Sequence, residues 1–269
     1  MPEGHVTHRL AHELTAAFGG RPVRVASPQG RFAEASAVDG AVLDHAEAYG
    51  KHLFIEFDPS RIVTIHLGLI GKLRLLEAGE KEPVAPARLR ISAGGVVAEL
   101  RAPQTCQLIA DVDRQAVMAR LGADPLRTDA RPELAWRKIH ASPRSIASLL
   151  MDQGVTAGVG NIYRAEVLFR NRVPPLLPGR ELSRLKWNRI WADLVQLMAL
   201  GVRDARVDTV REQHTPEAMG REPRVDRHGG EVYVYRRHGQ ACLVCGRPVR
   251  TDLVEGRNLY WCSRCQRGS

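Results

Sequence analysis

The chain has 269 residues, of which 44% are hydrophobic, and a net charge of +9. It has neither a run of about eighteen apolar residues nor a signal-peptide pattern, so we exclude a membrane-spanning helix and expect an intracellular protein. A basic chain suggests an anionic partner, and nucleic acid is the commonest large one. The charge is concentrated in residues 232–269, which hold seven arginines against Asp252 and Glu255, a net charge of +5.

The first half of the chain predicts one helix followed by short strands. A helix is expected over 3–18, because apolar residues recur every four positions at Val6, Leu10, Leu14 and Phe18. From about 22 to 110 the apolar runs are short and are separated by glycines or by Asp58-Pro59; they include HLFIEF (52–57), RIVTIHL (61–67) and KLRLL (72–76). RLRIS and VVAELR flank a hairpin turn at 93–95. Strands at this spacing predict a sandwich or barrel.

The second half of the chain predicts helices, from about 115 onward. Helical spacing is found in AVMARLG, ARPELAWRKIH, PRSIASLLMDQ, NIYRAEVLFRN and the long run that begins at ELSRLKW. PLRTDARP (125–132) is expected to link the two halves. Residues 205–231 are polar and lack a clear period, so we expect a mobile loop there.

Four of the five cysteines form two C-x-x-C pairs separated by sixteen residues. The pairs are Cys242 with Cys245 and Cys262 with Cys265, and Cys106 stands alone. Free or redox-active cysteines are the alternative, but this spacing suits one tetrahedral metal. The 38 residues from 232 onward are also too few to build a core of their own. We therefore predict one zinc ion, structural rather than catalytic because four cysteines leave no open coordination position.

Two further segments suggest phosphate contacts. RPVRT and NLYWC predict a hairpin that carries the metal ligands, with Arg257 projecting from its tip. An arginine there suits a phosphate, although a solvated surface arginine is an equal alternative. The run LLMDQGVTAGVGNIYRAEVLF (149–169) predicts two helices joined by a glycine-containing turn, with Asn161 as the cap of the second. The amides of such a helix start bind phosphate, but an ordinary packing element fits equally well.

The chain opens with MPEGHVTHRL, which raises the question of why Pro2 precedes the first helix. Proline suits the first turn of a helix, where its missing N–H costs nothing. From position alone, a helix-starting role is the preferred interpretation of Pro2.

Five motifs in one order nevertheless resemble a single family over nearly the whole chain. They are MPEG at the start, YGKHLF (49–54), HLGLIGKLRL (66–75), DQGVTAGVGNIYRAEVLF (152–169) and the final VYRRHGQACLVCGRPV…EGRNLYWCSRCQ. The chain resembles the formamidopyrimidine-DNA glycosylase and endonuclease VIII family of base-excision repair enzymes.

The resemblance implies an α+β fold in three parts, with DNA in a basic cleft. These are an N-terminal β-sandwich domain with flanking helices (1–124), a helix-two-turn-helix domain with the mobile loop (125–231), and a zinc-finger β-hairpin (232–269).

The resemblance also implies a bifunctional DNA glycosylase and AP lyase. Once Met1 is removed, Pro2 is the nucleophile and forms a Schiff base with the sugar, while Glu3 acts as general acid and base. Lys51 is implied as the proton donor in β-elimination and Arg257 in δ-elimination. Asn161 is implied to contact a DNA phosphate, Glu166 is interpreted as structural, and zinc takes no chemical part.

Departures from the family's patterns bear on the substrate. Branches that act on oxidised purines fill the vacated base stack with a methionine from the first loop and an arginine and a phenylalanine from a second. Here the first loop reads Gly68-Leu69-Ile70, and the second, APQTCQ (102–107), has neither arginine nor phenylalanine. Leu69 occupies the place of the central leucine of endonuclease VIII. The resemblance is therefore closer to that branch, and oxidised pyrimidines are the expected substrates.

Two other classes of protein are alternatives. A non-catalytic, zinc-dependent binder of damaged or abasic DNA would explain the charge and the zinc but would not need Pro2, Glu3 and Lys51 together. An RNA- or ribosome-associated basic protein is disfavoured by the N-terminal motif. We expect a cytoplasmic, nucleoid-associated monomer whose partner is double-stranded or single-stranded damaged DNA, without a membrane.

Overall fold

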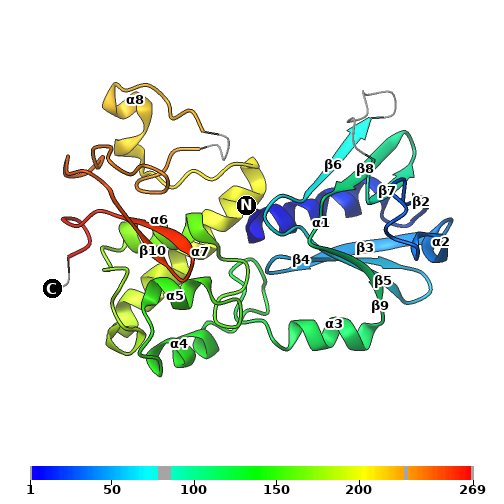
Figure 1. The fold of residues 1–269 in the computed structure, drawn as a ribbon, viewed down its shortest axis with the longest axis horizontal. Coiled ribbons are helices and arrows are strands. Elements are labelled where there is room, and N and C mark those ends of the chain that lie inside the picture. The colour runs from blue at the N-terminus through cyan, green and yellow to red at the C-terminus, as the bar shows by residue number, and fades with distance from the viewer. Residues whose placement is uncertain (1, 78–85, 227–229, 268–269) are drawn as a thin grey trace. The chain divides into compact units, whose positions relative to one another are not determined.

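The computed structural model describes residues 2–77, 86–226 and 230–267, which form two compact units, 1–120 and 121–269 (Figure 1). Across the described ranges, no helix combines the length and apolar character that crossing a membrane requires.

In its described residues, the first unit contains two antiparallel sheets and three helices. The five-stranded sheet has the order β1-β3-β4-β5-β9, and the four-stranded sheet the order β2-β7-β8-β6. The strands are β1 (Arg21–Pro22), β2 (Arg24–Ala26), β3 (Val42–Tyr49), β4 (His52–Phe57), β5 (Arg61–His66), β6 (Lys72–Glu77), β7 (Leu89–Ala93), β8 (Val96–Arg101) and β9 (Thr105–Ile109). The helices are α1 (Gly4–Phe18), α2 (Ala35–Val38) and α3 (Asp111–Met118).

One apolar core joins the two sheets and α1. It contains Leu14 and Phe18 from α1, Leu53 from the five-stranded sheet, and Leu89 and Leu100 from the four-stranded sheet, all buried. The predicted sandwich with flanking helices is therefore confirmed. The turn between β7 and β8 also matches, since Gly94 and Gly95 both have positive φ, as a two-residue hairpin turn requires.

The second unit is mainly helical and ends in a hairpin. Its elements are α4 (Pro132–His140), α5 (Ile146–Met151), α6 (Asn161–Arg170), η1 (Gly179–Glu181), α7 (Arg184–Asp204), η2 (Glu212–His214), α8 (Pro216–Met219), β10 (Arg250–Val254) and β11 (Arg257–Trp261). A single core contains Tyr163 and Trp187 from the helices together with Val249, Leu259 and Cys262 from the last segment. The cysteine-rich segment is thus packed on the helices and shares their core.

Three details differ from the sequence expectations. The first hairpin strand begins at Arg250, three residues later than RPVRT suggested, because the chain at 247–249 is hydrogen-bonded to 239–242 instead. The predicted helix at AVMARLG is the end of α3, which stops at Met118. The segment 205–231 has more structure than expected, since its described part contains η2 and α8 and is hydrogen-bonded to the unit's core at Thr209 and Arg211.

Candidate functional site

The chain before α1 holds Pro2 and Glu3. Glu3 has extended backbone angles and caps the helix, and its carbonyl accepts the Val6 amide at 2.9 Å. Pro2 therefore lies before the cap, two residues ahead of the first residue of α1, so starting the helix does not account for it. The Glu3 side chain is only 1% exposed, which is unusual for a carboxylate at a chain end.

The start of α1 lies near the turn that carries Lys51. The Gly20 amide donates to the Leu43 carbonyl, and Thr15 Oγ1 bonds both the Ala46 amide, at 2.8 Å, and the Ala46 carbonyl, at 3.2 Å. The helix therefore runs antiparallel to β3. From Thr15 back to Gly4 the helix covers about 16 Å. From Ala46 to its end at Tyr49, β3 covers about 10 Å in the same direction, and the turn that holds Lys51 follows. Helix start and turn thus reach the same end of the first unit (Figure 1).

Lys51 lies in the two-residue turn between β3 and β4. Tyr49 and His52 pair across this turn, and Gly50 has a φ of +59°. Glycine is favoured there because other residues rarely adopt positive φ in the first turn position. Lys51 is the second residue of the turn, and its position is fixed by the pairing of β3 with β4.

The loop that carries Leu69 belongs to the same end of the sheet, because His52 pairs with His66 in the β4–β5 ladder. The loop closes through the Gly71 amide, which donates to the Leu67 carbonyl at 3.0 Å. Leu69 and Ile70 are 65% and 74% exposed at its tip. Two adjacent apolar side chains so exposed are poorly explained by the fold alone.

The second loop supports the first. β9 already begins at Thr105, so only Ala102–Gln104 of the predicted second loop is outside a strand. The Gln104 amide donates to the His66 carbonyl at 2.9 Å, and a Cβ on Gly68 would lie 2.8 Å from Gln104 Cβ. This segment, which has neither arginine nor phenylalanine, therefore packs against the first loop at Gly68.

Two histidines beneath these loops are held neutral. Burial, then the neighbouring His66 and Lys51, lowers the pKa of His52 to about 4. Burial and Lys51 also lower the pKa of His66, although a hydrogen bond to Gln104 opposes this. His66 Nδ1 accepts the Gly68 amide at 3.1 Å, which requires that nitrogen to be unprotonated. The neutral histidine thus fixes the base of the Leu69 loop.

In the second unit, α5, a tight turn and α6 form the predicted helix-turn-helix. Gln153 organises the turn: its Nε2 donates to the carbonyls of Met151 and Val159 at 2.9 and 3.0 Å, and its Oε1 accepts the Gly158 amide at 3.0 Å. Gly158 has a φ of +83°.

The expectation that Asn161 caps α6 is wrong. The cap residue is Gly160, and Asn161 is the first residue of the helix. Its side chain is used in another way, because Asn161 Nδ2 donates to the Asn258 carbonyl of β11 at 2.9 Å and its Oδ1 accepts from Arg164. Asn161 therefore joins the helix start to the hairpin.

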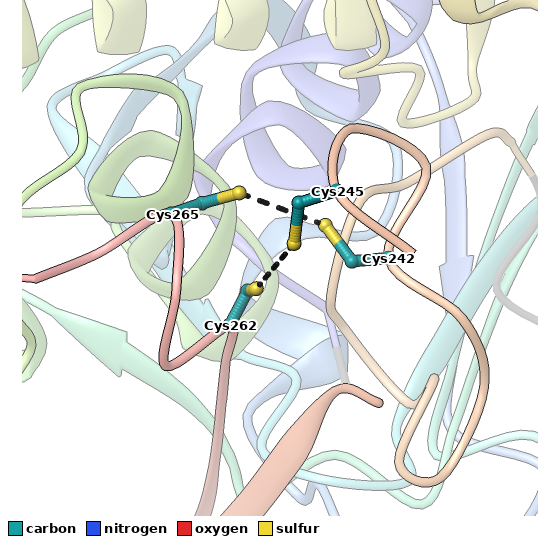
Figure 2. Close-up of side chains that lie close together, drawn as sticks. All are labelled: Cys242, Cys245, Cys262 and Cys265. Carbon is teal, nitrogen blue, oxygen red and sulfur yellow. Dashed lines mark hydrogen bonds between the residues drawn. The ribbon is translucent and has the colours of Figure 1, made fainter. Parts of the chain in front are cut away.

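The four paired cysteines converge from two loops, as Figure 2 shows. All their sulfur atoms lie within 4.8 Å of one another, and the Cys242–Cys265 and Cys245–Cys262 Sγ distances are 3.9 and 3.4 Å. A tetrahedral zinc with Zn–S bonds of about 2.3 Å needs sulfurs about 3.8 Å apart. The donor set and its spacing thus fit one zinc ion, which would be held structurally.

The chain around the cysteines fits the same role. Gly246, directly after the first pair, has a φ of +73° and donates its amide to the Cys242 carbonyl. Gln266 is buried after the second pair, where it accepts the Cys262 amide at 2.9 Å and donates to the Val173 carbonyl at 3.0 Å. Burial raises the pKa of the Cys242 thiol to about 11, so a metal must displace its proton.

Arg257 begins β11 and is exposed, next to the hairpin turn. Val254 and Arg257 pair across that turn, whose residues Glu255 and Gly256 have φ of +48° and +73°. The expectation that a hairpin carries Arg257 near its tip is consistent with this geometry.

Two buried residues of α6, Glu166 and Arg164, make contacts that the sequence does not predict. Glu166 accepts the amides of Tyr233, Val234 and Tyr235 at 2.7–2.9 Å and the Thr209 hydroxyl at 2.6 Å, which agrees with its structural interpretation. Arg164 is also buried, and the sequence analysis did not propose it as a functional residue. Its spacing of three from Asn161 is the signal that predicts contact between them along a helix.

Three family models match the chain. The formamidopyrimidine-DNA glycosylase N-terminal domain matches residues 1–106, the H2TH domain of the same family matches 121–212, and the zinc finger found in FPG and IleRS matches 239–268. Among curated relatives, "Endonuclease 8 1" of Mycobacterium tuberculosis is 46% identical over 274 residues, covering 99% of this chain and 100% of the relative. The formamidopyrimidine-DNA glycosylase of Parasynechococcus marenigrum is 30% identical over 256 residues, covering 90% and 88%.

Solved structures agree on the fold. The MutM (Fpg) protein of Thermus thermophilus has a TM-score of 0.77 at 28% identity and covers 98% of both chains. Lactococcus lactis Fpg, solved in complex with DNA that contains an abasic site, has a TM-score of 0.78 at 21% identity and covers 99% and 100%.

The two-sheet unit, the helix-two-turn-helix and the four-cysteine hairpin together define a base-excision repair enzyme of the class that combines DNA glycosylase and AP lyase activities. The chain belongs to the formamidopyrimidine-DNA glycosylase and endonuclease VIII family. Its relation to a protein named for endonuclease VIII agrees with the branch that the sequence suggested.

Proposed function

We propose that this enzyme removes oxidised bases, with pyrimidines favoured, and cleaves the strand by β,δ-elimination through a Schiff base on Pro2. The proposal is supported by the position of Pro2 and Glu3 at the start of α1 and of Lys51 in the β3–β4 turn, both toward one end of the first unit. The relation to "Endonuclease 8 1" and the Leu69 loop support oxidised pyrimidines as substrates.

The chemistry follows from the properties of a terminal secondary amine. A generic α-amino group with a pKa of about 7.7–8.0 is about 10–20% free amine at pH 7, whereas an unperturbed lysine is free at less than about 0.1%. Proline is more basic than the generic amine, and the positive start of α1 lowers its pKa while Glu3 opposes this. After Met1 is removed, the Pro2 nitrogen attacks C1′ of a flipped-out nucleotide. The base leaves with a proton, for which Glu3 is the proposed acid.

The Pro2 nitrogen gives up its proton, the C1′–O4′ bond opens, and O4′ takes up a proton, which leaves a charged iminium at C1′. The iminium then draws electrons from the sugar. Loss of a C2′ proton expels the 3′ phosphate, and a second elimination expels the 5′ phosphate, so a one-nucleotide gap with phosphate at both ends remains. Lys51 is the proposed proton donor of the first elimination and Arg257 of the second. Leu69 fills the vacated stack, and Asn161 and Arg257 contact phosphates. Zinc supplies no chemistry and holds the hairpin that bears Arg257.

The proposed setting is the DNA of the cell interior. The enzyme acts as a monomer in the nucleoid, on duplex or single-stranded damaged DNA. A non-catalytic binder of abasic DNA is the alternative, and nicking of an abasic oligonucleotide distinguishes the two, because a binder leaves the strand intact.

Borohydride trapping tests the nucleophile directly. Reduction of the iminium should cross-link the protein to abasic DNA, with the adduct on Pro2 by peptide mapping. Pro2→Ala should reduce trapping steeply, and an uncleavable tag before residue 2 should abolish it, because an amide nitrogen is not nucleophilic. Lys51→Ala is the control, since it should keep the cross-link while slowing strand cleavage. An adduct on Lys51 with unmodified Pro2 would refute the proposal.

A further inference from the structure

The strand β11, which begins at Arg257, is hydrogen-bonded to the start of α6 through one carbonyl group. The Asn258 carbonyl accepts Asn161 Nδ2 at 2.9 Å and Arg164 Nη2 at 3.1 Å. Arg164 Nη2 also donates to Asn161 Oδ1. One guanidinium thus contacts both the side chain of Asn161 and the residue that follows Arg257.

Arg164 is an unusual residue to find at this junction. It is only 1% exposed, and burying a guanidinium is costly unless the surroundings hold it with hydrogen bonds. Its planar, forked donors can serve two acceptors in fixed directions at once, which the single ammonium of a lysine on a flexible stem does less well. The donation to Oδ1 also sets which way the Asn161 amide points, so that Nδ2 faces the hairpin.

A second arginine holds the other side of the turn. Arg144 Nη2 donates to both oxygens of Glu255 at 3.3 Å, and its Nη1 donates to Asp152 Oδ2 at 2.8 Å. Glu255 is part of the turn itself, so Arg257 lies between two tethered residues. The Arg144 and Glu255 side chains are 45% and 55% exposed, and an ion pair so exposed contributes little. The buried contact through Arg164 is therefore the stronger tether.

We propose that Arg164 is a positioning residue for the second elimination: it fixes the backbone beside Arg257 and the orientation of Asn161. The inference rests on the proposed function, because it assigns Arg164 to the step that Arg257 serves. The contacts of Arg164 with Asn161 and Asn258 lie within the second unit, whereas Pro2, Glu3 and Lys51 belong to the first, so at saturating enzyme base removal and the first elimination should proceed without them.

The experiment uses the full zinc-loaded enzyme and a labelled oligonucleotide with one preformed abasic site. Single-turnover assays resolve the β-elimination and δ-elimination products. Arg164→Lys should lower the ratio of δ to β product about tenfold, the scale of losing one hydrogen bond to a charged group, with the β rate within about twofold of the parent. Arg144→Ala should lower the ratio about twofold, as expected of an exposed pair.

Arg170→Lys is the matched control. Arg170 is on the same helix, is mostly buried, and binds Asp193 through two nitrogens at 3.1 and 2.9 Å and the Thr209 carbonyl at 2.6 Å. The same conservative change there should leave the product ratio unaltered. Zinc content and thermal unfolding establish that each variant is folded, and Arg164→Gln replaces the lysine variant if the latter loses zinc.

The outcomes separate the two hypotheses. A parent enzyme that forms no δ product refutes the proposed β,δ-elimination. A parent that forms it, with an unchanged ratio in the Arg164 variants, overturns the positioning role and leaves the function intact. Equal loss of both products, or loss of zinc from both variants, also overturns it, because Arg164 would then hold the fold rather than place Arg257.

Discussion

The two units hold their proposed functional residues in different ways. In the first unit, Lys51 is on a turn between the paired strands β3 and β4, and the loop with Leu69 follows β5, where His66 pairs with His52 of β4. A buried core of two sheets and α1 lies behind them. In the second unit, Arg257 is on an exposed hairpin whose base is a cluster of cysteines and whose turn is held by a few polar contacts.

This difference determines how each unit should respond to the loss of a single side chain or of the metal. Ladder hydrogen bonds and packing are spread over many residues, so single changes at the loops of the first unit should alter function without unfolding it. The hairpin of the second unit depends on one set of ligands, and its core is shared with the helices through residues such as Leu259 and Cys262. The second unit should therefore be the more easily disrupted.

The largest expected effect is that of zinc removal. Structural zinc in finger peptides contributes about 10–16 kcal/mol, which is comparable to the stability of a whole domain. Chelation should disorder residues 232–269 and loosen the helices that share their core. All four tryptophans are in the second unit, so tryptophan fluorescence should follow this loss. Hydrogen exchange of the first unit's strands should stay slow.

The lone cysteine offers a control for the zinc experiment. Cys106 is buried in β9 of the first unit, and Cys106→Ala should leave one zinc per chain. Cys262→Ala should abolish zinc binding. A well-folded preparation that contains no zinc would contradict the assignment, and simultaneous loss of both units on chelation would contradict the contrast between them.

Acid should act on the first unit through its neutral histidines. Burial lowers the pKa of His52 from its ordinary value of 6.5 to about 4 in the folded state, so the unfolded chain binds more protons between these values. Stability from His52 is therefore complete above pH 6.5 and is lost as the pH falls toward 4, by roughly 3 kcal/mol at most. The lowered pKa of His66 adds to the effect in the same direction.

Urea unfolding of the first unit at a series of pH values, followed by hydrogen exchange, measures this dependence. His52→Phe removes the titrating group and keeps an aromatic ring in the strand, so it should flatten the curve between pH 6.5 and 4. The exposed His12, on α1, is a control whose replacement by glutamine should leave the slope unchanged. An unaltered slope in His52→Phe would show that other groups govern the acid sensitivity.

The sequence was most informative where a local pattern determines the structure. The periodicity of α1, the run HLFIEF of β4 and the two C-x-x-C pairs each depend on residues close together in the chain, and all three were predicted correctly. The family motifs also indicated the class of enzyme.

Contacts between distant segments could not be predicted in the same way. The bond from Asn161 to Asn258 spans 97 positions, and it gives the asparagine a partner where a local rule predicts a cap. The support of Gly68 by Gln104 depends on the register of β5 and β9. The described part of 205–231 looks irregular in sequence because it is held by contacts such as those of Thr209 with Glu166 and Arg211 with Tyr233, not by its own periodicity.

The smallest of the three effects that distinguish the units is confined to the tip of one loop in the first unit. Leu69→Ala removes an exposed apolar side chain that is proposed to fill the space of a flipped-out base. On duplex DNA the variant should lose about tenfold in base excision, which corresponds to about 1.4 kcal/mol of transition-state stabilisation. On single-stranded DNA it should retain the parent rate, because there is no stack to refill.

Leu253→Ala is the matched control from the other unit, since Leu253 is 66% exposed on β10 and Leu69 is 65% exposed. Loss of a leucine of equal exposure from β10 should change the rate of base excision on neither duplex nor single-stranded DNA. The measurement is the ratio of duplex to single-strand excision rates on the same lesion, with Ile70→Ala beside it to divide the effect between the two tip residues. Equal losses on both substrates in Leu69→Ala would show that the leucine stabilises the loop rather than the opened duplex.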